Sequence, residues 1–200
     1  MNFQLKMEEI INNFDEDEKP KLLIHSCCGP CSSCVLECLS KYFLITIYYY
    51  NPNIDTEGEF NKRFSEQKRL IKEMDLENPI NLIKGEYNTS IFNEIVEGLE
   101  ELSEGKERCF KCYEFRMREI ARYAKDNDFD YFTTTLSVSP YKNSNKINEI
   151  GEIIESEYNV KFLYSDFKKK DGYKRSIELS KLYELYRQDY CGCIFSKEFK

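Results

Sequence analysis

Short apolar runs alternate with longer amphipathic stretches along the chain, and this alternation predicts its secondary structure. Runs rich in leucine, β-branched and aromatic residues predict strands at 21–26, 43–50, 80–84, 131–136 and 160–167. The stretches between them predict helices at 32–42, 59–74, 90–102, 109–127, 146–157 and 176–187. Another amphipathic helix is expected within residues 1–18, ahead of the first strand.

This order of elements is typical of βαβ units, whose right-handed crossovers place helices on both faces of a mostly parallel sheet. We therefore expect an α/β fold in a single domain. Residues 1–19 would form a helical extension, and residues 20–200 the α/β domain with the candidate site. Functional loops of such folds follow the carboxyl ends of the strands. Four segments should therefore meet at one edge of the sheet, namely CCGPC, YNPN, SPYKN and SDFKKKDGY.

Composition narrows the class of protein. The formal net charge of −7 argues against binding to nucleic acid through overall charge, although a local basic groove remains compatible with it. The N-terminal segment is charged and lacks the apolar core of a signal peptide. The longest apolar runs, such as FLITIYYY, are too short to span a bilayer. A cytoplasmic protein without a membrane partner is expected.

Nine cysteines are unusual for that compartment, where thiols stay reduced, and an odd number excludes simple pairing. Metal ligation or redox catalysis is the better explanation. Cys27 and Cys28 lie at a predicted strand-to-helix turn, where a helix N-terminus favours the thiolate. Cys109 and Cys112 form a CxxC motif at a predicted helix start. These two pairs suit either Zn²⁺ or a [4Fe-4S] cluster.

The remaining thiols divide into two kinds. Cys191 and Cys193 flank Gly192, which permits a contorted disulfide of the labile, catalytic kind; the alternatives are tail thiols or extra metal ligands. Cys34 and Cys38 fit buried packing on one helix face. Cys31 lies on the same face and close to the turn, so its role stays open.

Several segments, taken in order, resemble the successive motifs of the QueH family of epoxyqueuosine reductases. They are HSCCGPCS (25–32), YNPNI (50–54), GKERCFKCYEFRM (105–117), FTTTLSVSPYKN (132–143), SDFKKKDGYKRS (165–176) and YRQDYCGCIFS (186–196). Together they span nearly all of the chain from Lys21 onward, which is far more specific than one CxxC motif.

The resemblance implies a Rossmann-like three-layer fold similar to the adenine-nucleotide α-hydrolase type, without that type's ATP-binding loop. It also implies a [4Fe-4S] cluster on four cysteines, Cys27, Cys28, Cys109 and Cys112. Cys191 and Cys193 would form a redox-active disulfide, and an additional iron can accompany the cluster. The implied reaction removes the epoxide oxygen of epoxyqueuosine at the tRNA wobble position to give queuosine. The implied partners are that tRNA and an electron donor that the sequence does not identify.

Loss of the epoxide oxygen requires two electrons and two protons. A cluster transfers single electrons, whereas a dithiol stores two, so the resemblance and the thiol content agree. The proton donor is expected among Tyr141, Asp166 and His25, although a lone strand histidine is more often a core residue. The basic run KKKDGYKR (168–175) and the arginines of 108–122 are candidates for phosphate contacts, with a solvated face as the alternative.

Three other functions compete with this interpretation. One is a zinc-stabilised RNA-binding module without redox activity. Another is an ATP-dependent tRNA sulfur-transfer enzyme, which the missing phosphate-binding Gly-Ser loop disfavours. The third is a general thiol–disulfide oxidoreductase, which would leave CCGPC and the CxxC helix without a role.

Overall fold

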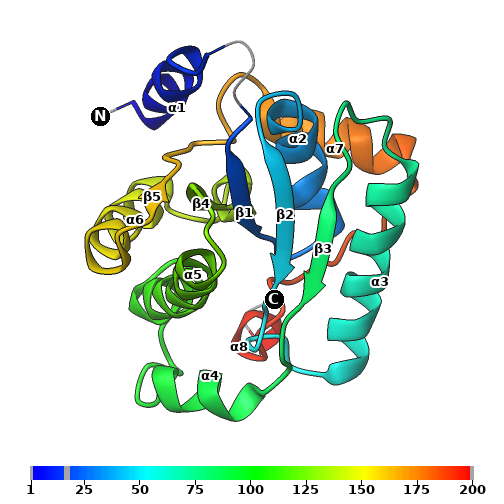
Figure 1. Cartoon of the computed structure of the whole chain (residues 1–200). Helices are drawn as coiled ribbons and strands as arrows, with labels where there is room; N and C mark the ends of the chain where they lie inside the picture. The colour runs from blue at the N-terminus through cyan, green and yellow to red at the C-terminus, as the bar shows by residue number, and fades with distance from the viewer. Residues whose placement is uncertain (1, 16–18, 199–200) are drawn as a thin grey trace.

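The computed structural model describes residues 2–15 and 19–198. At its centre is a parallel five-stranded sheet in the order β3-β2-β1-β4-β5. Its strands are β1 (Lys21–His25), β2 (Leu44–Tyr49), β3 (Asn81–Lys84), β4 (Tyr131–Thr134) and β5 (Lys161–Phe162). The chain adds β2 and β3 on one side of β1, then returns to add β4 and β5 on the other, so the direction of winding reverses between β1 and β4 (Figure 1).

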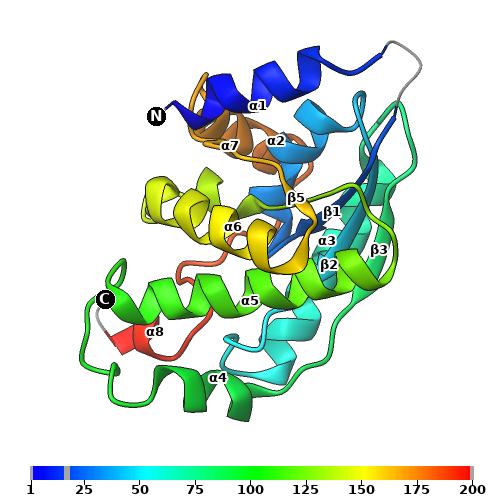
Figure 2. The same cartoon turned by 60° about the vertical axis from the view of Figure 1, so that its left-hand side comes forward.

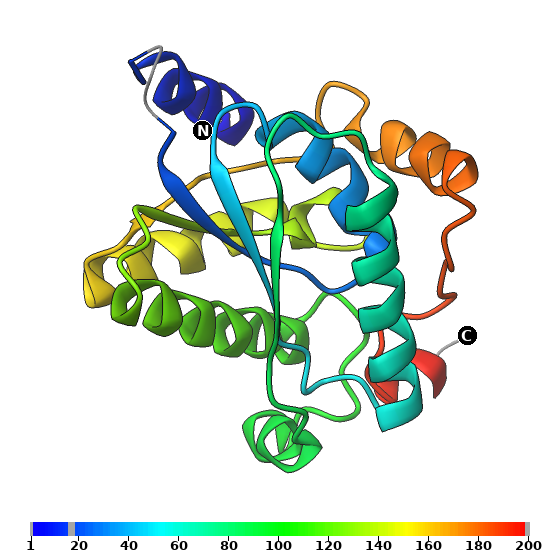
Figure 3. The same ribbon diagram turned by 45° about the vertical axis from the view of Figure 1, so that its right-hand side comes forward.

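Helices cover both faces of the sheet, as Figures 2 and 3 show. They are α1 (Phe3–Asn12), α2 (Gly29–Leu39), α3 (Glu57–Glu73), α4 (Thr89–Val96), α5 (Glu107–Asp126), the 3-10 helix η1 (Thr135–Val138), α6 (Ser144–Tyr158), α7 (Gly172–Leu182) and α8 (Phe195–Glu198). The expected three-layer α/β fold is confirmed.

Strand β1 shows why the sheet needs a helical layer on each side. Successive side chains of a strand point to opposite faces, and all of β1 except Lys21 is buried. Leu22 and Ile24 pack in a core with residues of α2, α3 and α7. Leu23 packs in a second core with residues of α5 and α6. A continuous apolar run, rather than an alternating one, is therefore the expected pattern for this strand.

Two strands end at least two residues earlier than the sequence predicts, each for a local reason. The strand expected at 131–136 stops at Thr134, whose hydroxyl accepts a hydrogen bond from the N–H of Leu136 and opens η1. The strand expected at 160–167 is only two residues long. Beyond it, the Asn148 side chain bonds both the N–H and the C=O of Ser165, at 3.0 and 2.8 Å, and so supplies partners that a neighbouring strand would otherwise provide.

The predicted N-terminal helix corresponds to α1, which buries Met7 and Ile11 in the core beside α2. The rest of the predicted helix at 1–18 includes residues 1 and 16–18, which lie outside the described residues. Within 2–15 and 19–198, no helix combines the length and apolar character needed to cross a lipid bilayer. The carboxyl ends of the strands point toward α4 and α8 (Figure 1).

Candidate active site

The turn between β1 and α2 brings three thiols together. Cys28 is the N-cap of α2 and has extended backbone, and Pro30 occupies the first turn, where its missing N–H costs nothing. The Sγ atoms of Cys27, Cys28 and Cys31 all lie within 4.8 Å of one another, and those of Cys27 and Cys28 are 3.7 Å apart. Cys31, whose role the sequence leaves open, therefore belongs to this thiol cluster.

The three thiols share protons unequally. Hydrogen bonds from Cys28 and Cys31 hold the pKa of Cys27 well below its usual range. The same contact with Cys27 raises the pKa of Cys28 to about 12, and it also raises the pKa of Cys31. Cys27 is thus the first thiolate of the group, and it is the thiol most ready to bind a cation or attack an electrophile.

The second pair of cysteines lies in the first turns of α5. Cys109 packs against the same apolar core as Cys27 and Cys28, and its Sγ accepts a hydrogen bond from the N–H of Gly105 at 3.2 Å. Cys112 packs with Cys193 in a small cluster, and burial raises the pKa of Cys112 to about 12. Both predicted pairs therefore lie in one region, at the carboxyl edge of the sheet.

The segment around Gly192 is held against this region by its backbone. Arg63 Nη1 donates to the Cys191 carbonyl at 2.9 Å, and the N–H of Asp55 donates to the Gly192 carbonyl at 2.9 Å. Gly192 has φ +126, a conformation that favours glycine. Cys191 and Cys193 are both free thiols, so the redox-active disulfide stays a prediction.

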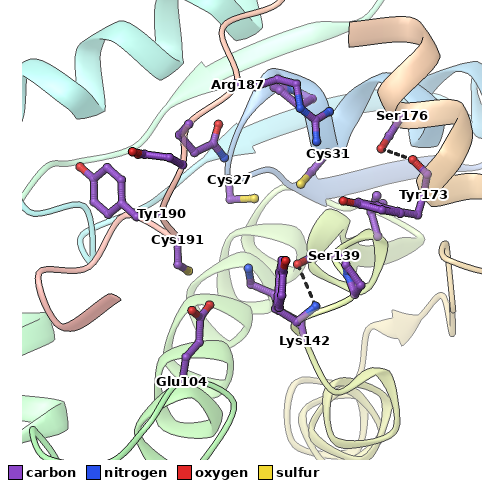
Figure 4. A pocket seen from close by; sticks show the side chains of 16 residues that line it. Cys27, Cys31, Glu104, Ser139, Lys142, Tyr173, Ser176, Arg187, Tyr190 and Cys191 are labelled. Atoms are coloured by element: carbon purple, nitrogen blue, oxygen red, sulfur yellow. Dashed lines mark hydrogen bonds between the residues drawn. The ribbon is translucent and has the colours of Figure 1, made fainter. Parts of the chain in front are cut away.

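A cavity of about 370 Å³ opens between these elements, as Figure 4 shows. Three thiols line it, from the turn after β1 and from the C-terminal segment, namely Cys27, Cys31 and Cys191. Three aromatic side chains line it as well, namely Tyr141, Tyr173 and Tyr190. Its volume is within the range of small-molecule sites, and it lies where the winding of the sheet reverses.

A buried arginine faces the thiols without an acidic partner. Arg116 of α5 is 1% exposed, and within the described part of the chain it bonds two oxygen atoms, the Cys112 carbonyl at 3.2 Å and Asn51 Oδ1 at 3.3 Å. Its Nη2 has no partner among the described residues. Burial alone would lower the pKa of Arg116, yet the neighbouring thiols, Cys112 foremost, raise it. A buried cation of this kind calls for negative charge beside it, and thiolates can supply that charge.

The structure argues against His25 as a proton donor to a substrate. His25 is fully buried, with Nε2 3.1 Å from the Tyr50 carbonyl and Nδ1 2.9 Å from Thr134 Oγ1. The carbonyl can only accept, so Nε2 carries the proton and Nδ1 accepts from the Thr134 hydroxyl. Burial lowers the pKa of His25 to about 3, so the ring is neutral. It is a satisfied core residue, which was the alternative interpretation of the sequence.

The other two predicted donors lie in different surroundings. Tyr141 lines the cavity and is 74% exposed. Asp166 is buried and forms an ion pair with Lys168 at 3.2 Å, and it is not among the residues that line the cavity. Of the two, only Tyr141 is placed to meet a ligand there.

The basic runs offer fewer free charges for phosphate contacts than the sequence suggests, although Lys169 and Lys174 are exposed and form no ion pair among the described residues. In KKKDGYKR, Lys168, Lys170 and Arg175 are each paired with acidic side chains. On α5, Arg118 and Arg122 are likewise paired, whereas Arg108 and Arg116 are buried. A sequence run shows which charges are present but not which of them are already neutralised.

Comparison with known proteins places this site in a family. A sequence model described as "Epoxyqueuosine reductase QueH" matches residues 22–199. The chain is 40% identical to the epoxyqueuosine reductase QueH of Staphylococcus epidermidis, over 98% of this chain and 84% of that protein. It is 35% identical to the QueH of Thermotoga maritima, over 88% of this chain and 89% of that protein.

Among solved structures, the U34-tRNA thiolase NcsA from Methanococcus maripaludis, with its [4Fe-4S] cluster, shares the fold at a TM-score of 0.52 and 12% identity. The match covers 97% of this chain and 67% of that one, and at this identity it concerns the fold alone. The sequence relationships reach further, because they extend over nearly the whole chain at more than 30% identity. The chain therefore belongs to the QueH family of epoxyqueuosine reductases.

Proposed function

We propose that this protein is an iron–sulfur oxidoreductase that reduces epoxyqueuosine in the anticodon wobble position of tRNA to queuosine. The observation that carries the proposal is the cavity of about 370 Å³ that Cys27, Cys31 and Cys191 line in a chain of the QueH family. The reaction takes up two electrons and two protons, leaves an alkene in place of the epoxide and releases the oxygen as water.

Cys27, Cys28, Cys109 and Cys112 are the proposed ligands of a [4Fe-4S] cluster. The donor set fits, since four thiolates are the usual ligands of such a cluster. The unpaired Nη2 of buried Arg116 fits too, because a thiolate-bound cluster is an anion. The cluster would supply single electrons at low potential. Cys31 remains beside Cys27 as a further thiol, and an additional iron is part of the proposal.

The chain's own residues would then position and enclose the substrate. Arg63 and Asp55 fix the backbone of residues 191 and 192, so Cys191 reaches the cavity where Cys27 also lies. We propose that Cys191 and Cys193 cycle between dithiol and disulfide and so hold an electron pair. Tyr141, at the cavity and largely exposed, is suited to stack on the modified base.

The proposal extends to the setting of the enzyme. Its partners would be the epoxyqueuosine-containing tRNA and a low-potential electron donor of unknown identity, in the cytoplasm. The α/β domain of residues 20–200 would carry all of the catalytic groups, with the helix before it as an extension.

Product analysis by mass spectrometry tests the function. Protein reconstituted with iron and sulfide without oxygen would receive dithionite and epoxyqueuosine-containing tRNA, and the digested tRNA is searched for queuosine. Wild-type protein should yield a nucleoside that is lighter by one oxygen. Cys109→Ser should yield none, whereas Cys38→Ala, a packing cysteine of α2, should act like wild type. Absence of queuosine from the loaded wild-type protein would refute the proposed reaction.

The same preparation distinguishes the zinc-stabilised RNA-binding module, which remains the alternative. An iron–sulfur protein is brown and absorbs visible light, whereas bound Zn²⁺ gives no colour. A colourless protein that retains zinc, binds tRNA and turns over no substrate would favour the binding module.

A further inference from the structure

A lysine in the cavity has no partner for its charge. Lys142 follows η1, lines the cavity and is 9% exposed. Among the described residues, its Nζ forms no hydrogen bond and no ion pair, although the neighbouring Lys168 Nζ is paired with Asp166. In Figure 4 the side chain extends toward the space between Cys27 and Cys191. Since most of the side chain is buried and its ammonium meets the cavity rather than a protein acceptor, this group is placed to bind a ligand there.

The backbone around Lys142 is firmly placed. Its N–H donates to the Ser139 carbonyl at 3.2 Å, and its carbonyl accepts a hydrogen bond from Lys168 Nζ at 3.3 Å. These two contacts fix the backbone that carries the side chain beside the cavity.

In the working enzyme proposed above, Cys191 would carry no charge while in a disulfide, and Cys27 would belong to an anionic metal centre. Arg116, which lies outside the cavity lining, already compensates the charge of these thiols. The ammonium of Lys142 is then left to interact with whatever occupies the cavity.

Other donors at the cavity are less suited to a buried anion. Tyr141 and Arg187 are exposed to solvent, which weakens any charge interaction they make. The Tyr190 hydroxyl is engaged with Asp55 at 2.7 Å, and the Ser176 hydroxyl with the Tyr173 carbonyl at 2.7 Å. Among the described residues that line the cavity, Lys142 combines a largely buried side chain with a cationic group that no protein acceptor binds.

We propose that Lys142 is a catalytic residue whose ammonium donates a hydrogen bond to the epoxide oxygen of the bound nucleoside. The inference rests on the proposed function. Both C–O bonds of the epoxide break and a C=C bond forms, with two electrons from a low-potential one-electron donor and two protons that leave with the oxygen as water. Negative charge gathers on that oxygen as the bonds break, and a preorganised cation beside it stabilises the charge without solvent rearrangement.

Replacement of Lys142 by methionine tests this assignment, because methionine keeps most of the volume and removes the charge. Loss of one preorganised donor of this kind costs roughly 10²- to 10³-fold in turnover. Lys142→Met should therefore lower kcat by about that factor, with KM for the tRNA within about threefold of wild type. Lys142→Arg should recover part of the rate. Lys146→Met removes a lysine that is paired with Glu149 at the surface and should leave kcat unchanged.

Two further measurements separate the substrate from the metal centre as the partner of Lys142. The iron content and the visible spectrum of Lys142→Met should equal those of the wild type. A variant that loses iron, or whose visible spectrum changes as its rate falls, would assign Lys142 to the metal centre and overturn the proposal. Turnover of Lys142→Met within threefold of wild type would overturn it as well, with the proposed function intact. If the loaded wild-type protein itself forms no queuosine, the proposed function fails, and the ligand assigned to Lys142 fails with it.

Discussion

Arg63 offers the sharpest test of how the Cys191–Cys193 segment is held. The Arg63 side chain is 1% exposed, and it joins Glu59 at 2.6 Å to the Cys191 carbonyl at 2.9 Å. Methionine at this position fills similar space but donates no hydrogen bond. A hydrogen bond from a charged donor contributes about 1.5–3 kcal/mol. If its loss costs about 2 kcal/mol, the detached form of the segment becomes about 30-fold more populated.

Thiol alkylation reports that population without any turnover. Cys193 is 7% exposed, so iodoacetamide reaches it mainly when the segment detaches. In reduced, metal-free protein, Arg63→Met should raise the alkylation rate of Cys193 about 30-fold, as measured by peptide mass spectrometry. Cys34 is buried in the core beside α2 and reports global unfolding, so its rate should stay near that of wild type.

Two controls sharpen the interpretation. Arg122→Met removes a half-exposed arginine of α5 that bonds only acidic surface side chains, and it should leave Cys193 protected. The double variant Arg63→Met/Glu59→Gln also removes the Glu59 carboxylate, which would otherwise lack its guanidinium partner. This variant should still expose Cys193. An increase below threefold in both Arg63 variants would refute the claim that Arg63 holds the segment.

Three further predictions concern charge and packing. Arg116→Met should make the midpoint potential of the reconstituted cluster more negative in a redox titration, because loss of a buried positive charge disfavours the reduced state; an unchanged potential would contradict the role given to Arg116. The free energy of unfolding should fall as the pH drops below about 6.5, because His25 takes up a proton when unfolded but stays neutral in the fold down to about pH 3. For one group, this dependence of the unfolding free energy on pH is at most about 1.4 kcal/mol per pH unit. Urea titrations should show that His25→Gln removes it, and an equal pH dependence in both proteins would contradict the prediction. Gly151→Ala should lower the urea midpoint of unfolding, because the added Cβ would lie 2.3 Å from Phe162. Gly58→Ala is the control and should leave the midpoint unchanged, because its Cβ would meet nothing within 4 Å. Equal midpoints for the two variants would contradict the packing of α6 on β5.

The parallel sheet was predictable because its apolar runs are continuous. The grouping of the cysteines was predictable because their spacing in the sequence is distinctive. The early end of β5 was not, because it depends on Asn148, a helix residue whose side chain bonds a segment 17 positions away. The sequence also gives no sign of burial for a charged residue. The sequence pointed to Tyr141 in SPYKN as a candidate proton donor. In the structure the ring of Tyr141 is exposed, whereas the adjacent Lys142 is buried. Likewise, Arg116 looks like its surface neighbours until the fold places it against the thiols.

The reversal of strand order between β1 and β4 has a consequence for how such sites can evolve. The crevice there follows from backbone connectivity, since the loops after the two strands leave in opposite directions whatever their side chains are. The loop after β1 contributes Cys27, Cys28 and Cys31, and the loop after β4 contributes Lys142, so either can be exchanged while the sheet beneath it is kept. A scaffold of this kind can acquire new chemistry one loop at a time, and it offers protein designers two separate insertion points into a single cavity.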